Sequence, residues 1–349
     1  MNERLEQRIE RFLRTDEGDF DALALELFSY QFERNRPYQA FCKAQGCTPG
    51  TVTRWQDVPA VPIRAFKSTE LATFPISQAA AVFHSSGTTR NQPSRHFFRT
   101  LTYYETALAS GFARWVLADQ ARLPYCVLAP TPGEIPHSSL SWMLEVVLRK
   151  WGASGSDYYV RRGEVEEGRL FHFIEQRQAQ GEPVALLGTT LAFLQLFERC
   201  ARQGVSFRCA TGSRLMDTGG MKTQDREVSR SEFLRDVWAY LGIPEAGCIN
   251  EYGMCELSSQ FYARGASEVF QGPTWVRTLG IDPGTGQPVG EGQTGLLRHF
   301  DLANVDSVMA IQTEDRGTPH PAGFVFKGRA NGADLKGCSL ALESYLKPA

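Results

Sequence analysis

The sequence predicts an α/β fold in which a mostly parallel sheet is covered by helices, with a small antiparallel β subdomain after it. Between residues 79 and 250, short apolar runs alternate with amphipathic stretches of helical length, which is typical of βα units. From Gly284, glycine-rich turns separate short apolar runs, which predicts hairpins. We therefore expect an α/β core with a helical N-terminal cover over residues 1–283, and the β subdomain with a short tail over residues 284–349.

The N-terminal part of the chain is predicted to be helical. Apolar residues recur at helical spacing over residues 3–14 and 20–45, so we expect these segments to be helices that cover the core. Pro59 and Pro62 follow in the segment 55–71. Each proline disfavours helix at the residue before it. The path of the chain at these two prolines is therefore predicted to be extended.

The middle of the chain is predicted to alternate strands and helices. The predicted strands are 79–83, 125–129, 183–188, 206–210 and 247–250, and three more in the β subdomain are 296–300, 308–312 and 324–326. The predicted helices are 101–118, 138–151, 168–180 and 191–203. Ligands of parallel sheets bind beyond the carboxyl ends of the strands. Loops that follow the predicted strands are therefore the candidate sites.

Composition excludes several classes of protein. The formal charge of −2, without long runs of one sign, argues against nucleic acid or an anionic membrane surface as a partner. The first 19 residues are rich in charge, which excludes a secretory signal, and no apolar stretch is long enough to span a membrane. The eight cysteines form no C-x-x-C pair, so neither a zinc site nor a disulfide framework is indicated. We expect a cytoplasmic protein.

The strongest functional signal is a polar loop built from Ser85, Ser86, Gly87, Thr88 and Thr89. Backbone N–H groups in such a turn can form an anion-binding concavity, and a glycine lets a bulky anion approach the backbone. The loop is not a P-loop, because a second glycine and a Gly-Lys-Ser/Thr sequence are missing. Taken alone, it fits a polyphosphate site and an ordinary polar turn about equally well.

Three later stretches change this balance. Ser-Ser-Gly-Thr-Thr resembles the phosphate-binding signature of adenylate-forming enzymes, the superfamily of acyl-CoA synthetases, luciferases and peptide-synthetase adenylation domains. Three later stretches resemble further motifs of that superfamily and occur in the same order: Tyr252-Gly253-Met254-Cys255-Glu256, Thr313-Glu314-Asp315 and Gly328-Arg329. Four signatures in the right order are more specific than any one of them. The resemblance implies the fold of an adenylate-forming enzyme N-terminal domain.

The resemblance also implies where ATP and Mg²⁺ would bind. The polar loop would hold the β and γ phosphates, and Tyr252, followed by Gly253, would lie on the adenine face. Gly219 and Gly220 would let the backbone approach the edge of the adenine ring. Taken singly, a residue such as Tyr252 is as well explained as a buried aromatic.

The remaining implied contacts are polar. Glu256 would be the metal ligand, because Mg²⁺ usually takes one or two carboxylates plus phosphate oxygens. Asp315 would accept hydrogen bonds from the ribose hydroxyls, with Arg329 donating nearby. Alone, Glu256 could equally be an acid at a helix start, and Asp315 part of an ordinary turn.

Within the superfamily, the chain is most similar to LuxE-type acyl-protein synthetases. The similarity lies in the proline-rich stretch with Phe66-Lys67, in Thr211-Gly212 before Gly219-Gly220, and in residues 273–277, 279–283 and 336–340. As in that family, the chain is expected to lack the mobile C-terminal domain and its catalytic lysine. Two departures stand out: the polar loop continues as Arg90-Asn91-Gln92-Pro93-Ser94 without a lysine, and Thr-Glu-Asp replaces the usual Thr-Gly-Asp.

The family resemblance assigns a role to the tail. In that family a cysteine receives the acyl group from the adenylate and passes it to a cysteine of a partner reductase, which would make Cys338 the acyl carrier. Lys336, two residues earlier, would lower the pKa of the thiol and so raise the fraction of reactive thiolate. The alternative is an incidental terminal cysteine.

Three functions remain open from the sequence. In the first, a carboxylic acid reacts with ATP to give acyl-AMP, then acyl-Cys338, and finally an acylated thiol on an acyl reductase or carrier protein. The resemblance implies that this acid is a fatty acid. In the second, the chain is a ligase that transfers the acyl group directly to the phosphopantetheine thiol of coenzyme A or a carrier protein. In the third, it is a non-catalytic nucleotide-binding subunit that docks a partner. The sequence does not name the acid.

Overall fold

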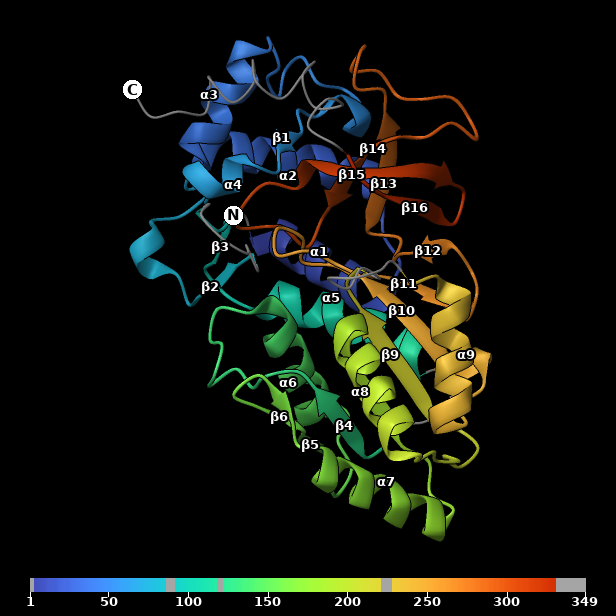
Figure 1. Ribbon diagram of the computed structural model, residues 1–349. Helices are drawn as coiled ribbons and strands as arrows, with labels where there is room; N and C mark the ends of the chain where they lie inside the picture. Colours follow the sequence, from blue (N-terminus) through green and yellow to red (C-terminus); the bar gives the residue numbers. More distant parts are fainter. Residues whose placement is uncertain (1–2, 86–91, 118–121, 221–227, 331–349) are drawn as a thin grey trace. The chain divides into compact units, whose positions relative to one another are not determined.

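The computed structural model describes residues 3–85, 92–117, 122–220 and 228–330 (Figure 1). The chain divides into two compact units, of which the first takes residues 1–110, 254–260 and 269–349 and the second takes residues 111–253 and 261–268. Each unit is therefore assembled from separate stretches of the chain. None of these boundaries falls at residue 283, where the sequence suggested a division.

The first unit begins with three helices, α1 (Glu3–Thr15), α2 (Phe20–Arg34) and α3 (Arg36–Ala44). The helical prediction for residues 20–45 is confirmed, except that the segment is divided into two helices at Asn35. Asn35 has an extended conformation, and its side chain accepts a hydrogen bond from the backbone N–H of Tyr38 (3.1 Å). Asn35 thus caps a new helix, whose first turn contains Pro37, a residue that suits a helix start.

The sheet of the first unit is mainly antiparallel. Its strands run in the order β13 (Val276–Ile281), β14 (Gly295–Asp301), β15 (Ala310–His320), β16 (Gly323–Arg329) and β12 (Val269–Gln271), and β1 (Val61–Pro62) pairs parallel with β15. The predicted antiparallel strands after residue 284 are confirmed, and two further strands precede them. The short helix α4 (Ala65–Ser68) follows β1, and a separate hairpin joins β2 (Ala81–His84) to β3 (Arg95–Phe98).

The second unit contains the parallel sheet that the alternating pattern predicted (Figure 1). Its order is β5 (Asp157–Tyr158), β4 (Tyr125–Leu128), β8 (Ala185–Thr189), β9 (Arg214–Thr218), β10 (Cys248–Tyr252) and the antiparallel β11 (Phe261–Arg264). Its helices are α6 (Ser139–Trp151), α7 (Glu167–Gln180), α8 (Thr190–Gln203) and α9 (Arg230–Leu241). The helix α5 (Thr102–Phe112) begins in the first unit, and the π-helix that continues it over Ala113–Leu117 belongs to the second.

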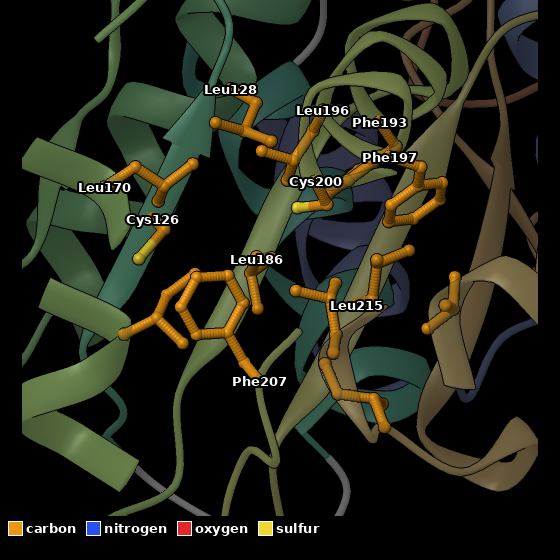
Figure 2. Packing of buried hydrophobic residues seen from close by; sticks show 14 of the residues in the cluster. Cys126, Leu128, Leu170, Leu186, Phe193, Leu196, Phe197, Cys200, Phe207 and Leu215 are labelled. Atoms are coloured by element: carbon orange, nitrogen blue, oxygen red, sulfur yellow. The ribbon is translucent and has the colours of Figure 1, made fainter. Parts of the chain in front are cut away.

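One face of this parallel sheet is the main hydrophobic core of the second unit (Figure 2). Cys126, Leu186 and Leu215 are register partners on three neighbouring strands, and Phe193 and Phe197 of α8 belong to the same cluster. Full burial of each leucine or phenylalanine side chain contributes about 1.5–3 kcal/mol. The helices on this face are thus held by apolar burial, which leaves the strand ends free to carry polar residues.

The strand predicted over residues 206–210 was wrong, because β9 is Arg214–Thr218. Phe207 is buried in the core shown in Figure 2, which explains the misleading apolar pattern. However, the backbone N–H groups of Phe207 and Cys209 donate to carbonyls at the end of α9, those of Tyr240 (2.7 Å) and Leu241 (2.9 Å). The segment therefore runs along a helix end. As a result, Thr211-Gly212 precedes a sheet strand instead of following one.

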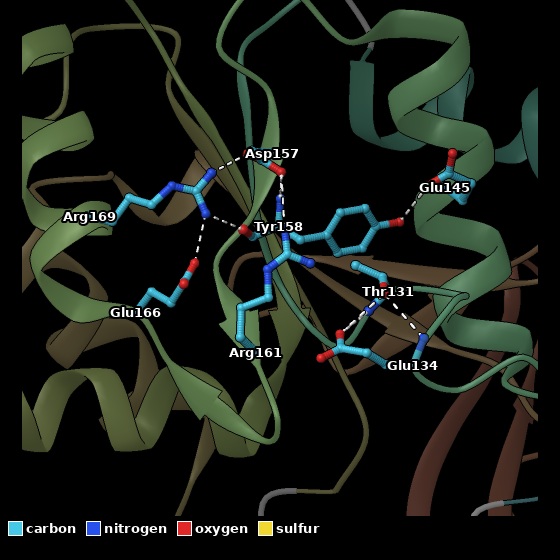
Figure 3. A network of polar contacts seen from close by, with 8 residues as sticks. All are labelled: Thr131, Glu134, Glu145, Asp157, Tyr158, Arg161, Glu166 and Arg169. Atoms are coloured by element: carbon cyan, nitrogen blue, oxygen red, sulfur yellow. Dashed lines mark hydrogen bonds and ion pairs between the residues drawn. The ribbon is translucent and has the colours of Figure 1, made fainter.

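An exposed network of ion pairs lies on the outside of the second unit (Figure 3). Arg169 of α7 pairs with Glu166 (2.7 Å) and with Asp157, and the Tyr158 hydroxyl donates to Glu145 (3.0 Å). All these groups except Tyr158 are at least partly exposed. In the part of the chain that the structure describes, no helix is long and apolar enough to cross a membrane.

Candidate functional site

The polar loop is the turn of the β2–β3 hairpin. Its base is closed by two hydrogen bonds: the Ser85 backbone N–H donates to the Ser94 carbonyl (3.2 Å), and the Ser94 backbone N–H donates to the Ser85 hydroxyl (3.0 Å). The strand before the loop pairs antiparallel with β3, so the expectation that it ends a strand of the parallel sheet was wrong. The other loop residues named as candidates, Ser86, Gly87, Thr88 and Thr89, lie outside the described residues.

Glu256 lies at the base of this loop, in the first unit. It is only 4% exposed, and its burial raises the pKa of the carboxyl group. A hydrogen bond from the Ser94 side chain and the positive charges of Arg329 and Lys67 act in the opposite direction and lower that pKa. Residues of three elements, Ser94 at the loop base, Arg329 of β16 and Lys67 of α4, therefore act on this one carboxylate.

Two of these contacts were not assigned from the sequence. Ser94 was noted only as part of the departure from the phosphate-loop pattern, yet it links the loop base to Glu256. Lys67 was named only as part of the family resemblance, yet it is partly buried and its charge acts on Glu256. The run of hydroxyl residues on both sides of the loop is the one sequence signal that could have pointed to Ser94.

Asp315 and Arg329 are cross-strand partners on β15 and β16. The Arg329 Nε lies 3.4 Å from an Asp315 carboxylate oxygen, and the Arg329 side chain is 84% exposed while Asp315 is buried. The Asp315 backbone N–H also donates to the Thr313 hydroxyl (3.1 Å), which in turn donates to the Leu297 carbonyl (2.7 Å). The Thr-Glu-Asp motif is thus held by its threonine, and its Asp315 carboxylate faces the Arg329 guanidinium of the neighbouring strand.

Gly328 and Glu314 are the residues next to Arg329 and Asp315 on the same two strands. Gly328 has a φ of +95°, in the left-handed region that favours glycine. Next to it, β15 and β16 shift register between Asp315 and Gly317. Glu314, which stands where the superfamily has glycine, forms an ion pair with Arg64 just before α4. The substituted residue therefore ties α4, with Lys67, to the motif.

The remaining candidates lie in the second unit, at the ends of two adjacent strands. Gly219 and Gly220 follow β9, and Tyr252 ends β10 with Gly253 after it. Gly219 has a φ of +97°, and among the residues that the structure describes a Cβ at either glycine would meet no atom within 4 Å. The need for glycine at position 219 thus comes from its backbone conformation, not from crowding.

The polar residues beneath these strand ends are heavily paired. Asp217 is fully buried and accepts from Arg230 (2.7 Å), Thr190 (2.9 Å) and Asn250 (2.9 Å). Burial raises the pKa of its carboxyl group, and these partners oppose the rise. On β10, burial raises the pKa of Glu251 to about 7, while a hydrogen bond from the Thr218 hydroxyl opposes it.

The tail candidates Lys336 and Cys338 lie outside the described residues. The seven other cysteines are free thiols. For each of them, burial raises the thiol pKa, to about 11 for Cys200 and about 12 for Cys42, Cys209 and Cys248. The pKa values of Cys47, Cys126 and Cys255 are likewise raised by burial. Among the described cysteines there is accordingly no ready thiolate nucleophile at neutral pH.

A metal site made of protein ligands alone is absent from the described ranges, where no three His, Cys, Asp or Glu side chains gather. A site of this kind would not be needed by Mg²⁺, which is commonly held by one or two carboxylates together with the phosphates of its substrate. Glu256 provides one such carboxylate next to two positive charges. The donor set thus suits a metal that arrives with a polyphosphate.

Comparison with solved structures shows the same fold in adenylate-forming ligases. An open conformation of 2-hydroxyisobutyryl-CoA ligase, in complex with 2-HIB-AMP and CoA, matches with a TM-score of 0.62 at 16% identity, over 88% of this chain and 68% of that chain. ATP-bound MatB from Rhodopseudomonas palustris matches with a TM-score of 0.52 at 14% identity, over 74% of this chain. The match spans about half of the MatB chain (49%). The predicted fold of an adenylate-forming domain is thereby confirmed.

Comparison of sequences identifies the family. The chain is 22% identical over 344 residues to the long-chain-fatty-acid–luciferin-component ligase of Aliivibrio fischeri, which covers 94% of this chain and 88% of that protein. It is also 22% identical over 329 residues to the ligase of the same name from Vibrio harveyi, covering 90% and 85% of the two chains. The family model for the acyl-protein synthetase LuxE matches residues 14–347. This chain therefore belongs to the LuxE family of acyl-protein synthetases and is an acid–thiol ligase.

Proposed function

We propose that this chain activates a fatty acid with Mg²⁺ and ATP and passes the acyl group, through a thioester on Cys338, to a thiol of a partner protein. In the first step a carboxylate oxygen attacks the α-phosphorus and pyrophosphate leaves. In the second step the Cys338 thiolate attacks the acyl carbon and AMP leaves. The partner's thiolate then displaces Cys338. The names of the bacterial relatives support a fatty acid as substrate and a component of a luminescence system as partner.

The observation that carries this proposal is the convergence at Glu256. Ser94 joins the base of the polar loop to this buried carboxylate, and the charges of Lys67 and Arg329 act on it. A loop that wraps phosphates next to a carboxylate that holds Mg²⁺ is what adenylation requires, because positioning and charge neutralisation supply most of the rate. Lys67 would provide the lysine that the loop itself lacks.

The other contacts to ATP are assigned by position. Asp315 would accept hydrogen bonds from the ribose hydroxyls, and the exposed Arg329 guanidinium beside it would donate to the nucleotide. Gly219 and Gly220, together with Tyr252 and Gly253, lie at adjacent strand ends of the second unit, where parallel sheets bind ligands. These four residues would take the adenine.

The choice of Cys338 as carrier is supported by elimination. Each of the seven described cysteines has a pKa that burial raises, whereas Lys336 would lower the pKa of the Cys338 thiol. The free thiols and the use of ATP also support an activity in the cytoplasm, a reducing compartment.

The proposal is tested by measuring the mass of the intact protein after incubation with Mg-ATP and a panel of fatty and aryl acids. The expected result is an acyl adduct, removed by hydroxylamine, on the wild type and not on Cys338→Ser. Cys47→Ser is the matched control, because Cys47 is a partly exposed thiol, and it should be acylated like the wild type.

Other outcomes would overturn parts of the proposal. An adduct that persists on Cys338→Ser would exclude Cys338 as carrier. Release of AMP and pyrophosphate without any adduct would indicate direct transfer to coenzyme A or to a carrier protein. ATP binding without pyrophosphate exchange for any acid would indicate a non-catalytic nucleotide-binding subunit.

A further inference from the structure

We propose that His96 and Asn304 are positioning residues that clamp the backbone of Glu256 at the base of the polar loop. Their side chains hold the carbonyl groups of two consecutive residues, Cys255 and Glu256. The proposal rests on the function proposed above, in which Glu256 is the metal ligand. It adds how the fold fixes that carboxylate relative to the loop.

His96 forms one half of this clamp. It lies on β3, is 1% exposed, and its Nδ1 donates to the Cys255 carbonyl (2.9 Å). A carbonyl oxygen only accepts, so Nδ1 carries the proton. Burial lowers the pKa of His96 to about 4, which keeps the imidazole neutral near pH 7. The ring packs against Phe66 and Phe98, with centroid distances of 5.7 and 4.1 Å, and this packing fixes its orientation.

Asn304 forms the other half. Its Nδ2 donates to the Glu256 carbonyl (2.8 Å) and to the Val308 carbonyl (3.2 Å). The Asn304 backbone is held in turn by Gln31 of α2, which donates to the Asn304 carbonyl (2.7 Å) and accepts from the Met309 backbone N–H (3.0 Å). The clamp is therefore anchored to a helix of the first unit.

The amide of Asn304 is kept at a cost. Its Oδ1 is buried and has no hydrogen-bond partner within the described part of the chain. An unpaired buried acceptor loses the hydrogen bonds that it would make with water. The two bonds donated by Nδ2 are thus what this side chain contributes, and one of them goes to Glu256.

Ser94 connects the clamp to the loop. Ser94 and His96 occupy alternate positions where β3 begins, so their side chains point to the same side of the hairpin. Ser94 binds the Glu256 carboxylate while His96 binds the preceding carbonyl. The hairpin that carries the loop thus holds both the side chain and the backbone of the Glu256 segment. Groups that orient a metal ligand in this way commonly change metal affinity about 10- to 100-fold when they are lost.

The test compares the Mg²⁺ dependence of pyrophosphate exchange in His96→Leu, Asn304→Leu and the wild type. Both variants are expected to need about 10- to 100-fold more Mg²⁺ for half-maximal exchange. His96→Asn should restore most of the Mg²⁺ affinity, because an asparagine amide can donate from nearly the position of Nδ1. If His96→Leu does not fold, His96→Gln keeps a polar side chain with its donor displaced and should show the shift.

A matched control separates positioning from stability. His299 is also a fully buried imidazole of the first unit, and it pairs with Thr278 (2.9 Å). His299→Leu should lower the melting temperature without changing the Mg²⁺ requirement. As a second readout, binding of Mn²⁺ in the presence of ATP, followed by the electron paramagnetic resonance of free Mn²⁺, should weaken in His96→Leu and not in His299→Leu.

The variant Glu256→Gln distinguishes the metal-binding role of Glu256 from the positioning role of His96 and Asn304. If this variant keeps the wild-type Mg²⁺ dependence, the metal role in the proposed function is overturned. If Glu256→Gln shifts the dependence while folded His96→Leu and Asn304→Leu behave like the wild type, the positioning role is overturned and the metal role stands.

Discussion

Two of the buried carboxylates, Asp217 in the second unit and Glu256 in the first, have different surroundings. Asp217 receives a direct ion pair from Arg230 at 2.7 Å, plus hydrogen bonds from Thr190 and Asn250. Glu256 receives a hydrogen bond from Ser94, and no ion pair to it forms among the residues that the structure describes. Its neighbouring cations, Lys67 and Arg329, act on it only through their charge.

In the function proposed above, this difference separates a structural carboxylate, Asp217, from a metal-binding one, Glu256. The charge of Asp217 is compensated by Arg230, and the hydrogen bonds that its carboxylate accepts come from side chains of the same unit. Burial disfavours the charged form of Glu256, and the nearby cations offset this only in part. A metal ion with a polyphosphate would complete the coordination of Glu256 and neutralise Lys67 and Arg329 at the same time.

The largest expected effect is on stability at Asp217. Asp217→Asn leaves the largely buried Arg230 without its counter-charge, and breaking a buried pair in this way costs about 3–5 kcal/mol. Urea unfolding of the variant should show this loss. Adding Arg230→Met should recover a large part of it, and a single variant as stable as the wild type would contradict a structural role for the pair.

At Glu256 the opposite pattern is expected. Glu256→Gln should reduce pyrophosphate exchange on the order of 10²- to 10³-fold, because a bound metal contributes several kcal/mol of charge stabilisation. Its free energy of unfolding should stay the same or rise, since a neutral amide is less costly to bury than a charge. A large loss of stability with full exchange activity would make Glu256 the structural carboxylate of the two.

The buried carboxyl group of Glu251 is expected to make the stability of the second unit depend on pH. Burial raises the pKa of Glu251 from 4.5 to about 7, so the folded state binds this proton more tightly than the unfolded state. The free energy of unfolding therefore falls as pH rises between these values, by roughly 3 kcal/mol. Urea unfolding of wild type and Glu251→Gln at about pH 5 and pH 8 measures the effect. Between these two pH values, the free energy of unfolding should fall by less in Glu251→Gln than in the wild type. An equal fall in both proteins would exclude a raised pKa of Glu251.

The smallest effect is expected in the exposed network of Figure 3. Arg169 and Glu166 pair at 2.7 Å, but their side chains are 42% and 38% exposed. Exposed pairs of this kind contribute about 0–1 kcal/mol. Glu166→Gln should therefore change the free energy of unfolding by less than about 1 kcal/mol, and added salt should reduce even that. If Glu166→Gln lost as much stability as Asp217→Asn, the energetic cost of breaking an ion pair would depend on the pairing itself and not on its burial.

Much of the fold followed from local patterns in the sequence. The helix over residues 191–203 and the strand before it were predicted within a few residues, because apolar spacing and the Thr189 cap act locally. The strand at 206–210 failed for a different reason. Phe207 has the burial of a strand residue, yet its backbone bonds to α9, and a hydrogen-bond partner more than 30 residues away leaves no local pattern.

The motifs, their order and the α/β alternation can be predicted from the sequence, because these depend on residue type and short-range spacing. That Ser94, His96 and Asn304 meet at residues 255–256, and that Lys67 of α4 acts on the same carboxylate, is visible only in the folded chain. These residues lie far apart in the chain. Contacts between such distant segments are set by how the hairpin, the helices and the strands pack, and packing is a property of the whole unit.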